Sequence, residues 1–334
     1  MENTKLGTAG PSVSRLGLGL MGMSGMYGPS DRAESIATVH AALDQGVTLL
    51  DTGDFYGMGH NEMLLQEALR GRDRDRAVIS VKFGALRDAD GGFHGVDLRP
   101  AAIKNFVAYS LQRLGVDHID VYRPARISPE FPIEDVVGTL AELVDKGWIR
   151  HIGLSEVGAQ TLRRAHAVHP ITDVQIEYSL ISRGIEQDIL PTANELGVAV
   201  TAYGVLSRGL ISGHWKPQAT AGDFRSHLPR FSGDALDHNL ALVEALRKIA
   251  AEKGVTVAQL AIAWVLGRGD GLVPLIGARR RDRLTEALGA LDVSLTPADL
   301  AAIEAAVPAD AAIGERYDPA QMRMLDSERR DGER

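Results

Sequence analysis

One pattern recurs along this chain and restricts its fold more than any other feature: a stretch with helical periodicity ends at a glycine, and a short apolar run follows. In the clearest unit, apolar residues return with the 3.6-residue period of a helix from Ile133 to Val144, and Gly147 precedes the apolar run 148–154. Glycine readily adopts the left-handed conformation that ends a helix. Each unit is therefore predicted to be a helix followed by a strand. Further units are centred on Gly46, Gly115, Gly197 and Gly271.

Eight apolar runs are candidate strands, and helices are expected between most of them. The runs lie near residues 15–20, 47–50, 77–81, 119–122, 149–154, 172–176, 198–202 and 272–276. Strands that alternate with helices form βαβ units and hence a parallel sheet. Eight such strands in 334 residues favour an α/β fold of the (β/α)8 TIM barrel type over an open sheet, with residues 1–334 as a single domain.

The glycines between Gly17 and Gly22 have the spacing of a dinucleotide-binding turn, which would point to a different α/β fold. In a Rossmann fold a helix starts directly after that turn. No helical pattern begins after Gly22, so the spacing does not support a Rossmann fold.

Four segments lie outside the repeat. Residues 5–14 are expected to form an N-terminal β-hairpin before the first barrel strand. Residues 83–99 and 207–237 are too long for simple connectors, and each follows a strand. Because the segments after the strands of a barrel meet at its catalytic face, both long loops are predicted to lie there. The tail after Pro308 is also long, and from about residue 315 we expect it to be solvated and frayed.

The composition excludes several classes of function. A net charge of −8 gives no reason to expect nucleic acid or an anionic membrane as a partner. The absence of cysteine excludes disulfides and thiol catalysis, and fits a reducing compartment. No apolar run approaches the roughly 18–20 residues that span a bilayer, and the N-terminal residues 1–6 lack the apolar stretch of a signal peptide. A cytoplasmic protein is therefore expected.

Three chemically matched residues follow two successive strand candidates. Asp51 and Tyr56 lie in the stretch 51–57, and Lys82 lies in the stretch 80–83. An unperturbed phenol has a pKa of about 10, too high for ready release of its proton at neutral pH. A neighbouring ammonium group would lower that pKa, and a carboxylate would keep the ammonium charged. Taken alone, Tyr56 would be interpreted as an aromatic residue at the rim of the barrel, and Lys82 as a solvated side chain. Together they predict general acid catalysis, with the proton going to a substrate oxygen.

The chain resembles the aldo-keto reductase family, in particular its bacterial and plant branch, from about Leu6 to Leu291. The matching stretches are GLMGM at 19–23, DTGDFYG at 51–57, GLSE at 153–156, VQIEYS at 174–179, AYGVL at 202–206, DFR and PRF within 223–231, and VPLIGARR at 273–280. The resemblance implies reduction of an aldehyde or ketone, a small-molecule carbonyl substrate, by hydride transfer. Tyr56 would be the general acid, Lys82 would lower its pKa, and Asp51 would orient Lys82.

The resemblance also implies a nicotinamide cofactor and its binding residues. Ser155 and Gln175 would bind the carboxamide, and Tyr203 would stack on the nicotinamide ring. The loop 206–209 would cover the pyrophosphate, and residues from 277 onward would hold the adenosine end. The full expected set is Gly22, Met23, Asp51, Ser155, Gln175, Tyr203, Leu206, Arg208, Gly209, Gly277, Arg279, Arg283 and Glu286.

The arginine run 279–283 favours NADPH over NADH. Guanidinium groups can bind a 2′-phosphate through paired hydrogen bonds, and the run follows the last strand, near the usual phosphate position of such barrels. Two positions depart from the family pattern: Ala278 stands where a hydroxyl residue is frequent, and Ala287 stands where Asn usually contacts adenine. We therefore expect a looser hold on the cofactor than is typical of the family.

The largest departure from the family follows the fourth strand. The family pattern Asp-x-Tyr-x-x-His begins here at Asp120, so that Ala125 takes the place of the histidine that orients the carbonyl. Arg123 shares a strand face with position 125 and is one candidate to contact the substrate instead. In the alternative, Arg123 or Arg126 pairs with a nearby acid and holds the loop. His60 is a second candidate for the lost donor.

The missing histidine keeps a rival function open. The rival is an NADP(H)-binding sensor or regulatory protein with weak or residual reductase activity, although a pure binder has less need of the Asp51, Tyr56 and Lys82 set. A third possibility is an enzyme whose substrate brings its own acidic or phenolic hydroxyl. No pair of histidines has metal-ligand spacing with a matching carboxylate, so no metal is expected. The sequence leaves the oligomeric state open.

Overall fold

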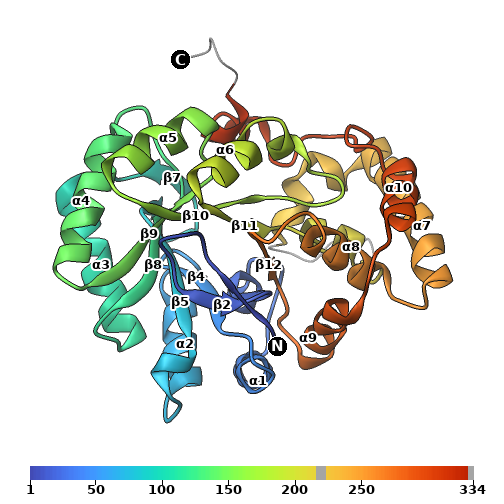
Figure 1. Cartoon of the computed structure of the whole chain (residues 1–334). Coiled ribbons are helices and arrows are strands. Elements are labelled where there is room, and N and C mark those ends of the chain that lie inside the picture. The colour runs from blue at the N-terminus through green and yellow to red at the C-terminus, as the bar shows by residue number, and fades with distance from the viewer. Residues whose placement is uncertain (216–222, 330–334) are drawn as a thin grey trace.

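The computed structural model describes residues 1–215 and 223–329, and in it eight parallel strands close into a barrel (Figure 1). The strands follow one another around the barrel in the order β10, β11, β12, β3, β4, β5, β8 and β9. All eight predicted strands are present, and the TIM barrel is confirmed. Their bounds are β3 Gly17–Gly19, β4 Leu49–Gly53, β5 Val78–Phe83, β8 Ile119–Pro124, β9 Ile149–Ser155, β10 Ile171–Glu177, β11 Ala199–Tyr203 and β12 Leu272–Ile276.

Helices surround the barrel, as Figure 1 shows. Local sequence explains several of their ends: the Asp31 side chain accepts from the Glu34 N–H at the start of α1, while Gly115 and Gly197 end α3 and α6 in the left-handed conformation. The helices are α1 Arg32–Asp44, α2 His60–Leu69, α3 Pro100–Leu114, α4 Ile133–Asp145, α5 Ala159–Val168, α6 Ile189–Leu196, α7 Gly233–Glu252, α8 Val257–Leu266, α9 Arg281–Leu288, α10 Pro297–Ala306 and α11 Pro319–Met322.

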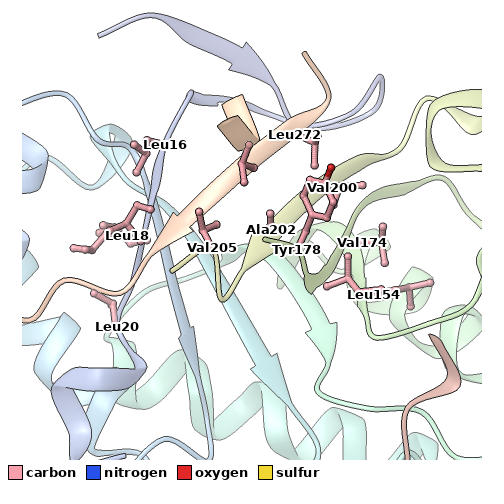
Figure 2. Packing of buried hydrophobic residues seen from close by; sticks show 14 of the residues in the cluster. Leu16, Leu18, Leu20, Leu154, Val174, Tyr178, Val200, Ala202, Val205 and Leu272 are labelled. Atoms are coloured by element: carbon pink, nitrogen blue, oxygen red, sulfur yellow. The ribbon is translucent and has the colours of Figure 1, made fainter. Parts of the chain in front are cut away.

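The main hydrophobic core lies between the strands and the helices. Side chains that alternate with the barrel-facing ones, such as Leu18, Leu154, Val174 and Val200, are buried there (Figure 2). Tyr122 of β8 belongs to this core and stacks on Phe83 at 4.2 Å between ring centroids. Because the Tyr122 side chain points outward, the side chains of Val121 and Arg123 on either side of it point into the barrel.

The predicted N-terminal hairpin is confirmed. Its strands β1 (Asn3–Lys5) and β2 (Ser12–Ser14) pair antiparallel. Leu6 and Val13 are fully buried in a second apolar cluster with barrel-facing residues near the amino ends of the strands, including Leu49 and Ala199. The hairpin thus closes that end of the barrel, and only the carboxyl ends of the strands are left for a site.

Among the described residues no single helix is long and apolar enough to cross a membrane. The pair α7 and α8 reaches the necessary length and composition together, but the two helices meet at 87°. α8 is a core helix: Trp264 is fully buried and lies 5.4 Å from Tyr178, between ring centroids. Its apolar composition is explained by this burial.

The described parts of both long loops lie at the carboxyl ends of the strands, as predicted, whereas residues 216–222 of the second loop lie outside the described part of the chain. The first contains a hairpin of β6 (Ala85–Arg87) and β7 (Phe93–Val96), and the second contains short 3-10 turns, beginning with Ser207–Ser212. Residues of both loops line the same cavity, among them Phe93 and Trp215.

The C-terminal tail is folded onto the barrel, so the prediction that it frays from about residue 315 is wrong as far as residue 329. Residues 330–334, which also belong to that prediction, lie outside the described part of the chain. Arg316 is 6% exposed and pairs with Glu156 at 2.6 Å, and Asp326 accepts from the Gly158 N–H. Ion pairs to buried carboxylates hold the tail, and the sequence alone gave no sign of those partners.

Candidate active site

A cavity of about 1620 Å³ opens at the carboxyl ends of the strands. This volume exceeds the roughly 300–1,000 Å³ of ordinary small-molecule pockets, so the cavity has room for a dinucleotide and a small substrate together. Every predicted site residue lines it except Met23, His60 and Arg123. The predicted residues that line it are Gly22, Asp51, Tyr56, Lys82, Ala125, Ser155, Gln175, Tyr203, Leu206, Arg208, Gly209, Gly277, Arg279, Arg283 and Glu286.

The three predicted catalytic residues are brought together. The Lys82 ammonium donates to one carboxylate oxygen of Asp51, while Ser80 and Gln175 each donate to the other at 2.8 Å. The Lys82 ammonium also lies 5.3 Å from the centroid of the Tyr56 ring. The Tyr56 hydroxyl makes no hydrogen bond with any described residue, so it can donate one to a molecule in the cavity.

Electrostatics around the trio differ from the prediction in one respect. Burial would raise the pKa of Asp51, but Lys82 and Arg123 outweigh it and hold that pKa below its usual value. Burial lowers the pKa of Lys82. Burial and the Asp51 carboxylate raise the pKa of Tyr56 well above 10, so the expected lowering by Lys82 is not found. Burial is the main cause, and the Asp51 carboxylate adds to it because it repels a phenolate.

Arg123 does not reach the cavity, which corrects the prediction that it contacts substrate. Its side chain is fully buried inside the barrel, where it donates to Asp173 at 3.0 Å and to Thr201 at 3.3 Å. It also lies 3.7 Å from an oxygen of Asp51. These contacts agree with the alternative prediction, that Arg123 pairs with a nearby acid. We call Asp51, Lys82, Arg123 and Asp173 the inner ion-pair layer.

Arg126 takes the position at the cavity that was predicted for Arg123. Ala125 ends the strand pairing by donating its N–H to the Phe83 carbonyl at 2.8 Å, and its side chain lines the cavity. The Arg126 guanidinium donates to the Ala125 carbonyl at 2.7 Å and to the Tyr317 hydroxyl at 3.3 Å. It is the one cation among the leading influences on Tyr56, whose pKa it lowers. Arg126 and Tyr56 line the same cavity.

Arg126 belongs to a second cluster of charged and phenolic side chains at the edge of the cavity. Tyr203 donates to Glu156 at 2.6 Å, and its hydroxyl lies 2.9 Å from that of Tyr317. Arg316 binds both oxygens of Glu156, at 2.9 and 2.6 Å. We call Arg126, Glu156, Tyr203, Arg316 and Tyr317 the rim cluster. Its hydrogen bonds connect the C-terminal tail to the barrel strands at the mouth.

Two further predictions are corrected by the positions of the side chains. His60 hydrogen-bonds Ser24 at 3.0 Å and Arg32 at 3.1 Å, and it does not line the cavity. It sits at the start of α2 and supports the loop rather than the substrate. Met23 is 1% exposed and packs in the main core, so its side chain does not face a cofactor.

Comparison with known proteins identifies the family. The sequence pattern of the Aldo/keto reductase family matches residues 15–308. The chain belongs to the aldo/keto reductase family. Membership makes it an oxidoreductase in general terms and agrees with the barrel and with the trio at its mouth.

Solved structures of aldo/keto reductases share the fold over nearly the whole chain. A glycerol dehydrogenase from Gluconobacter oxydans is 28% identical, with a TM-score of 0.83, and the match covers 97% of this chain and 96% of that one. The holo form of an aldo-keto reductase from Bacillus halodurans is 27% identical, with a TM-score of 0.77 and coverages of 95% and 100%. An aldo-keto reductase from Klebsiella pneumoniae in complex with NADPH is 27% identical, with a TM-score of 0.72 and coverages of 92% and 96%.

Several predicted cofactor residues of this aldo/keto reductase already have protein partners. Gln175 donates to Asp51 rather than facing the cavity alone. Arg208 donates to Glu177 at 2.9 Å and has a positive φ of 53° in the loop over the cavity. A non-glycine residue in that conformation is strained, and such strain is frequent at ligand-binding loops. Ser155 is buried and lines the cavity without such a bond.

The arginine run divides between the cavity and the surface. Arg279, Arg280 and Arg283 line the cavity, although Arg280 pairs with Asp282 at 2.7 Å and Arg283 with Glu286 at 3.0 Å. Arg281 does not line it and pairs with Glu34 at 2.9 Å. The Glu34 carboxylate also accepts the first N–H of α9, so that N–H is not free for a phosphate. The three cavity arginines still leave this end of the site suited to an anion.

Sequence reasoning gave no role at the site to Glu156, Arg316 and Tyr317. The sequence held one signal, that Glu156 directly follows the predicted Ser155. The positive φ of 54° at Glu156 and the partners of Arg316 and Tyr317 are known only from the structure.

Proposed function

We propose that this protein reduces an aldehyde or ketone to an alcohol with NADPH, and that Tyr56 is the proton donor. One observation carries the proposal: the Tyr56 hydroxyl faces the cavity without a protein partner, beside the buried pair of Lys82 and Asp51. A surface or structural tyrosine has no need of such a setting. The NADPH complex of the Klebsiella pneumoniae relative supports the choice of cofactor.

The residues along the cavity fit a nicotinamide dinucleotide. Bound NADPH supplies the hydride that the carbonyl carbon receives. Ser155 and Gln175 would hold the nicotinamide end near Tyr56, and the Arg208 loop would cover the pyrophosphate. Arg279 and Arg283 would bind the 2′-phosphate, since guanidinium groups pair with phosphate oxygens. Ala278 and Ala287, both buried at this end, add no hydrogen bonds to that hold.

Tyr56 delivers the proton that completes the reaction. Its raised pKa keeps the hydroxyl protonated at neutral pH, so it can donate a hydrogen bond to a carbonyl oxygen. When the carbon gains a hydride and the oxygen gains the Tyr56 proton, the C=O π bond is replaced by C–H and O–H bonds. The Arg126 guanidinium lowers the pKa of Tyr56 and so favours the phenolate that remains until water returns a proton.

The test is Tyr56→Phe, which removes the proton donor and little else. We expect NADPH-linked carbonyl reduction to fall at least about a hundredfold, the scale of general acid catalysis. NADPH binding, measured by fluorescence titration, is expected to persist. Tyr109→Phe is the matched control, because Tyr109 is 54% exposed on α3 and far from the cavity lining. Full turnover in the Tyr56 variant would contradict the assignment.

The second candidate function is an NADP(H)-binding sensor or regulatory protein with weak reductase activity. Ala125 favours it, because an alanine at the cavity cannot donate to a carbonyl oxygen. The raised pKa of Tyr56 favours it as well, because the proton is harder to release. A panel of aldehydes and ketones assayed by NADPH absorbance separates the two functions. Tight NADPH binding with no turnover of any member would support the sensor.

A further inference from the structure

The buried cations around the cavity are almost all neutralised by a carboxylate. In the inner ion-pair layer Lys82 pairs with Asp51, and Arg123 pairs with Asp173 at 3.0 Å. At the mouth, further cation–carboxylate pairs are Arg316 with Glu156 at 2.6 Å and Arg208 with Glu177 at 2.9 Å. Three arginines that line the cavity differ from these pairs, because no carboxylate of the described residues lies within ion-pair distance of Arg87, Arg126 or Arg279. Arg279 already donates to the carbonyls of residues 27–29, whereas Arg126 follows the strand that pairs with the strand of Lys82.

Arg126 is nevertheless held in place. Its guanidinium donates to the Ala125 carbonyl and the Tyr317 hydroxyl and lies 5.7 Å from the centroid of the Tyr317 ring. These contacts use only part of its five donors. A cation that is fixed by neutral groups and unpaired with an acid retains its attraction for an anion from outside.

The position of Arg126 relates it to the reacting atoms. Arg126 follows β8, which pairs with β5 so that Arg123 is opposite Lys82 and Pro124 is opposite Phe83. Residues 125 and 126 therefore leave the barrel beside the strand that carries Lys82, and both line the cavity with Tyr56. Ala125 contributes only a methyl group on this wall, so it presents no bulk to a ligand that contacts Arg126.

We propose that Arg126 determines substrate specificity by binding an anionic group, a carboxylate or a phosphate, that the carbonyl substrate carries. This rests on the proposed function and deepens it, because it names the substrate class of the same site. A planar guanidinium binds two oxygens of either anion at once. The anchored anion holds the carbonyl oxygen at Tyr56, which compensates for the donor that Ala125 does not provide.

The test uses pairs of carbonyl compounds that differ in one anionic group. The first pair is 4-carboxybenzaldehyde and methyl 4-formylbenzoate, and the second is glyceraldehyde 3-phosphate and glyceraldehyde. We expect the wild-type kcat/KM to favour the anionic member of at least one pair by about tenfold or more, the scale of a charge-assisted hydrogen bond. The two pairs separate a carboxylate-binding site from a phosphate-binding one.

Substitutions at Arg126 then identify the residue responsible. Arg126→Gln is expected to reduce the anionic-to-neutral ratio of kcat/KM at least about tenfold, mainly through KM, and Arg126→Lys to retain part of it. Arg150→Gln removes the same charge from an exposed position on β9 and should leave the ratio unchanged. Arg87 also lines the cavity. A loss of the ratio in Arg87→Gln, with none in Arg126→Gln, would overturn the proposal.

A measurement on the wild type keeps the proposal testable even if the variants do not fold. Benzoate is expected to inhibit reduction of the neutral aldehyde competitively, whereas benzamide at equal concentration is expected to inhibit at least about tenfold more weakly. Equal inhibition by both, together with equal turnover of both members of each pair, would overturn the inference and leave the proposed reductase intact. If no compound were turned over with NADPH, the proposed function itself would fail.

Discussion

The inner ion-pair layer and the rim cluster are both charged, but the inner layer is buried, whereas Arg126 and Tyr203 of the rim cluster are only partly buried. Asp51, Lys82, Arg123 and Asp173 come from the four strands β4, β5, β8 and β10, and each cation has its own carboxylate. The rim cluster joins strand ends to a tail that is distant in sequence: Glu156 and Arg316 are separated by 160 positions. It also contains a cation without an acid, Arg126.

This difference separates two roles. The inner layer is balanced in charge and held by the barrel strands, with Asp51 and Lys82 at the cavity and Arg123 and Asp173 below it, so we propose that it supports the chemistry at Tyr56. In the rim cluster Arg126, Tyr203 and Tyr317 line the cavity, and Arg126 has no carboxylate partner among the described residues, so we propose that this region distinguishes one carbonyl compound from another. Chemistry and specificity are thus assigned to strand residues and to loop and tail residues respectively.

Removing the acid from the inner layer is expected to have the largest effect on stability. Asp173→Asn leaves Arg123 fully buried, and a guanidinium cannot give up its charge to relieve the loss. Breaking such a pair costs about 3–5 kcal/mol of unfolding free energy. Urea unfolding of the variant and the wild type measures the difference.

The matched control for this variant is Asp44→Asn, which removes the acid of an exposed ion pair with Arg72 at 2.7 Å. Its unfolding midpoint is expected to match that of the wild type. Equal stability of Asp173→Asn and Asp44→Asn would show that the inner layer is not held by its ion pairs, and the comparison between the two regions would lose its basis.

Breaking the rim cluster is expected to act locally and more weakly on global stability. Arg316→Gln removes the cation that binds Glu156 and Glu328. Hydrogen exchange of the amides in residues 317–329 should then accelerate at least about tenfold, while the barrel strands keep their protection. Arg72→Gln, which disrupts the exposed pair, is the control and should leave the tail unchanged. Equal protection of the tail in both variants would contradict the docking described here.

The same ion pair makes tail docking dependent on pH. Burial would raise the pKa of Glu156, but Arg316 outweighs it and holds the pKa far below the ordinary value of 4.5. A carboxyl with a lowered pKa in the folded state contributes stability above its ordinary value, and that contribution is lost as the pH falls further. The difference between wild type and Arg316→Gln in the thermal midpoint should therefore be smaller at pH 4 than at pH 7.

The sequence was sufficient for the features that depend on local pattern. Short apolar runs predicted all eight strands, five of them after a helical stretch that ends at a glycine, and motif positions placed Asp51, Tyr56 and Lys82 at one mouth. Alternation along β8 correctly turned Arg123 inward, but it did not reveal Asp173, which binds it 50 positions later. A strand pattern gives the direction of a side chain and not the partner it meets across a barrel.

The rest depended on long-range contacts. The tail was predicted to be solvated because its end is rich in charged residues, yet Arg316 pairs with two buried carboxylates, Glu156 directly after β9 and Glu177 at the end of β10. The sequence placed Lys82 and Asp51 near the Tyr56 phenol, but it did not show how deeply Tyr56 is buried, and burial is the main cause of its raised pKa.

A crystal structure with NADP+ and the alcohol 4-(hydroxymethyl)benzoate tests the central claim most directly, since it shows both roles in one complex. The account predicts that the alcohol oxygen lies within about 3 Å of the Tyr56 hydroxyl and that the carboxylate pairs with the Arg126 guanidinium. An alcohol oxygen far from Tyr56, or a carboxylate bound to another cation with Arg126 unused, would contradict it.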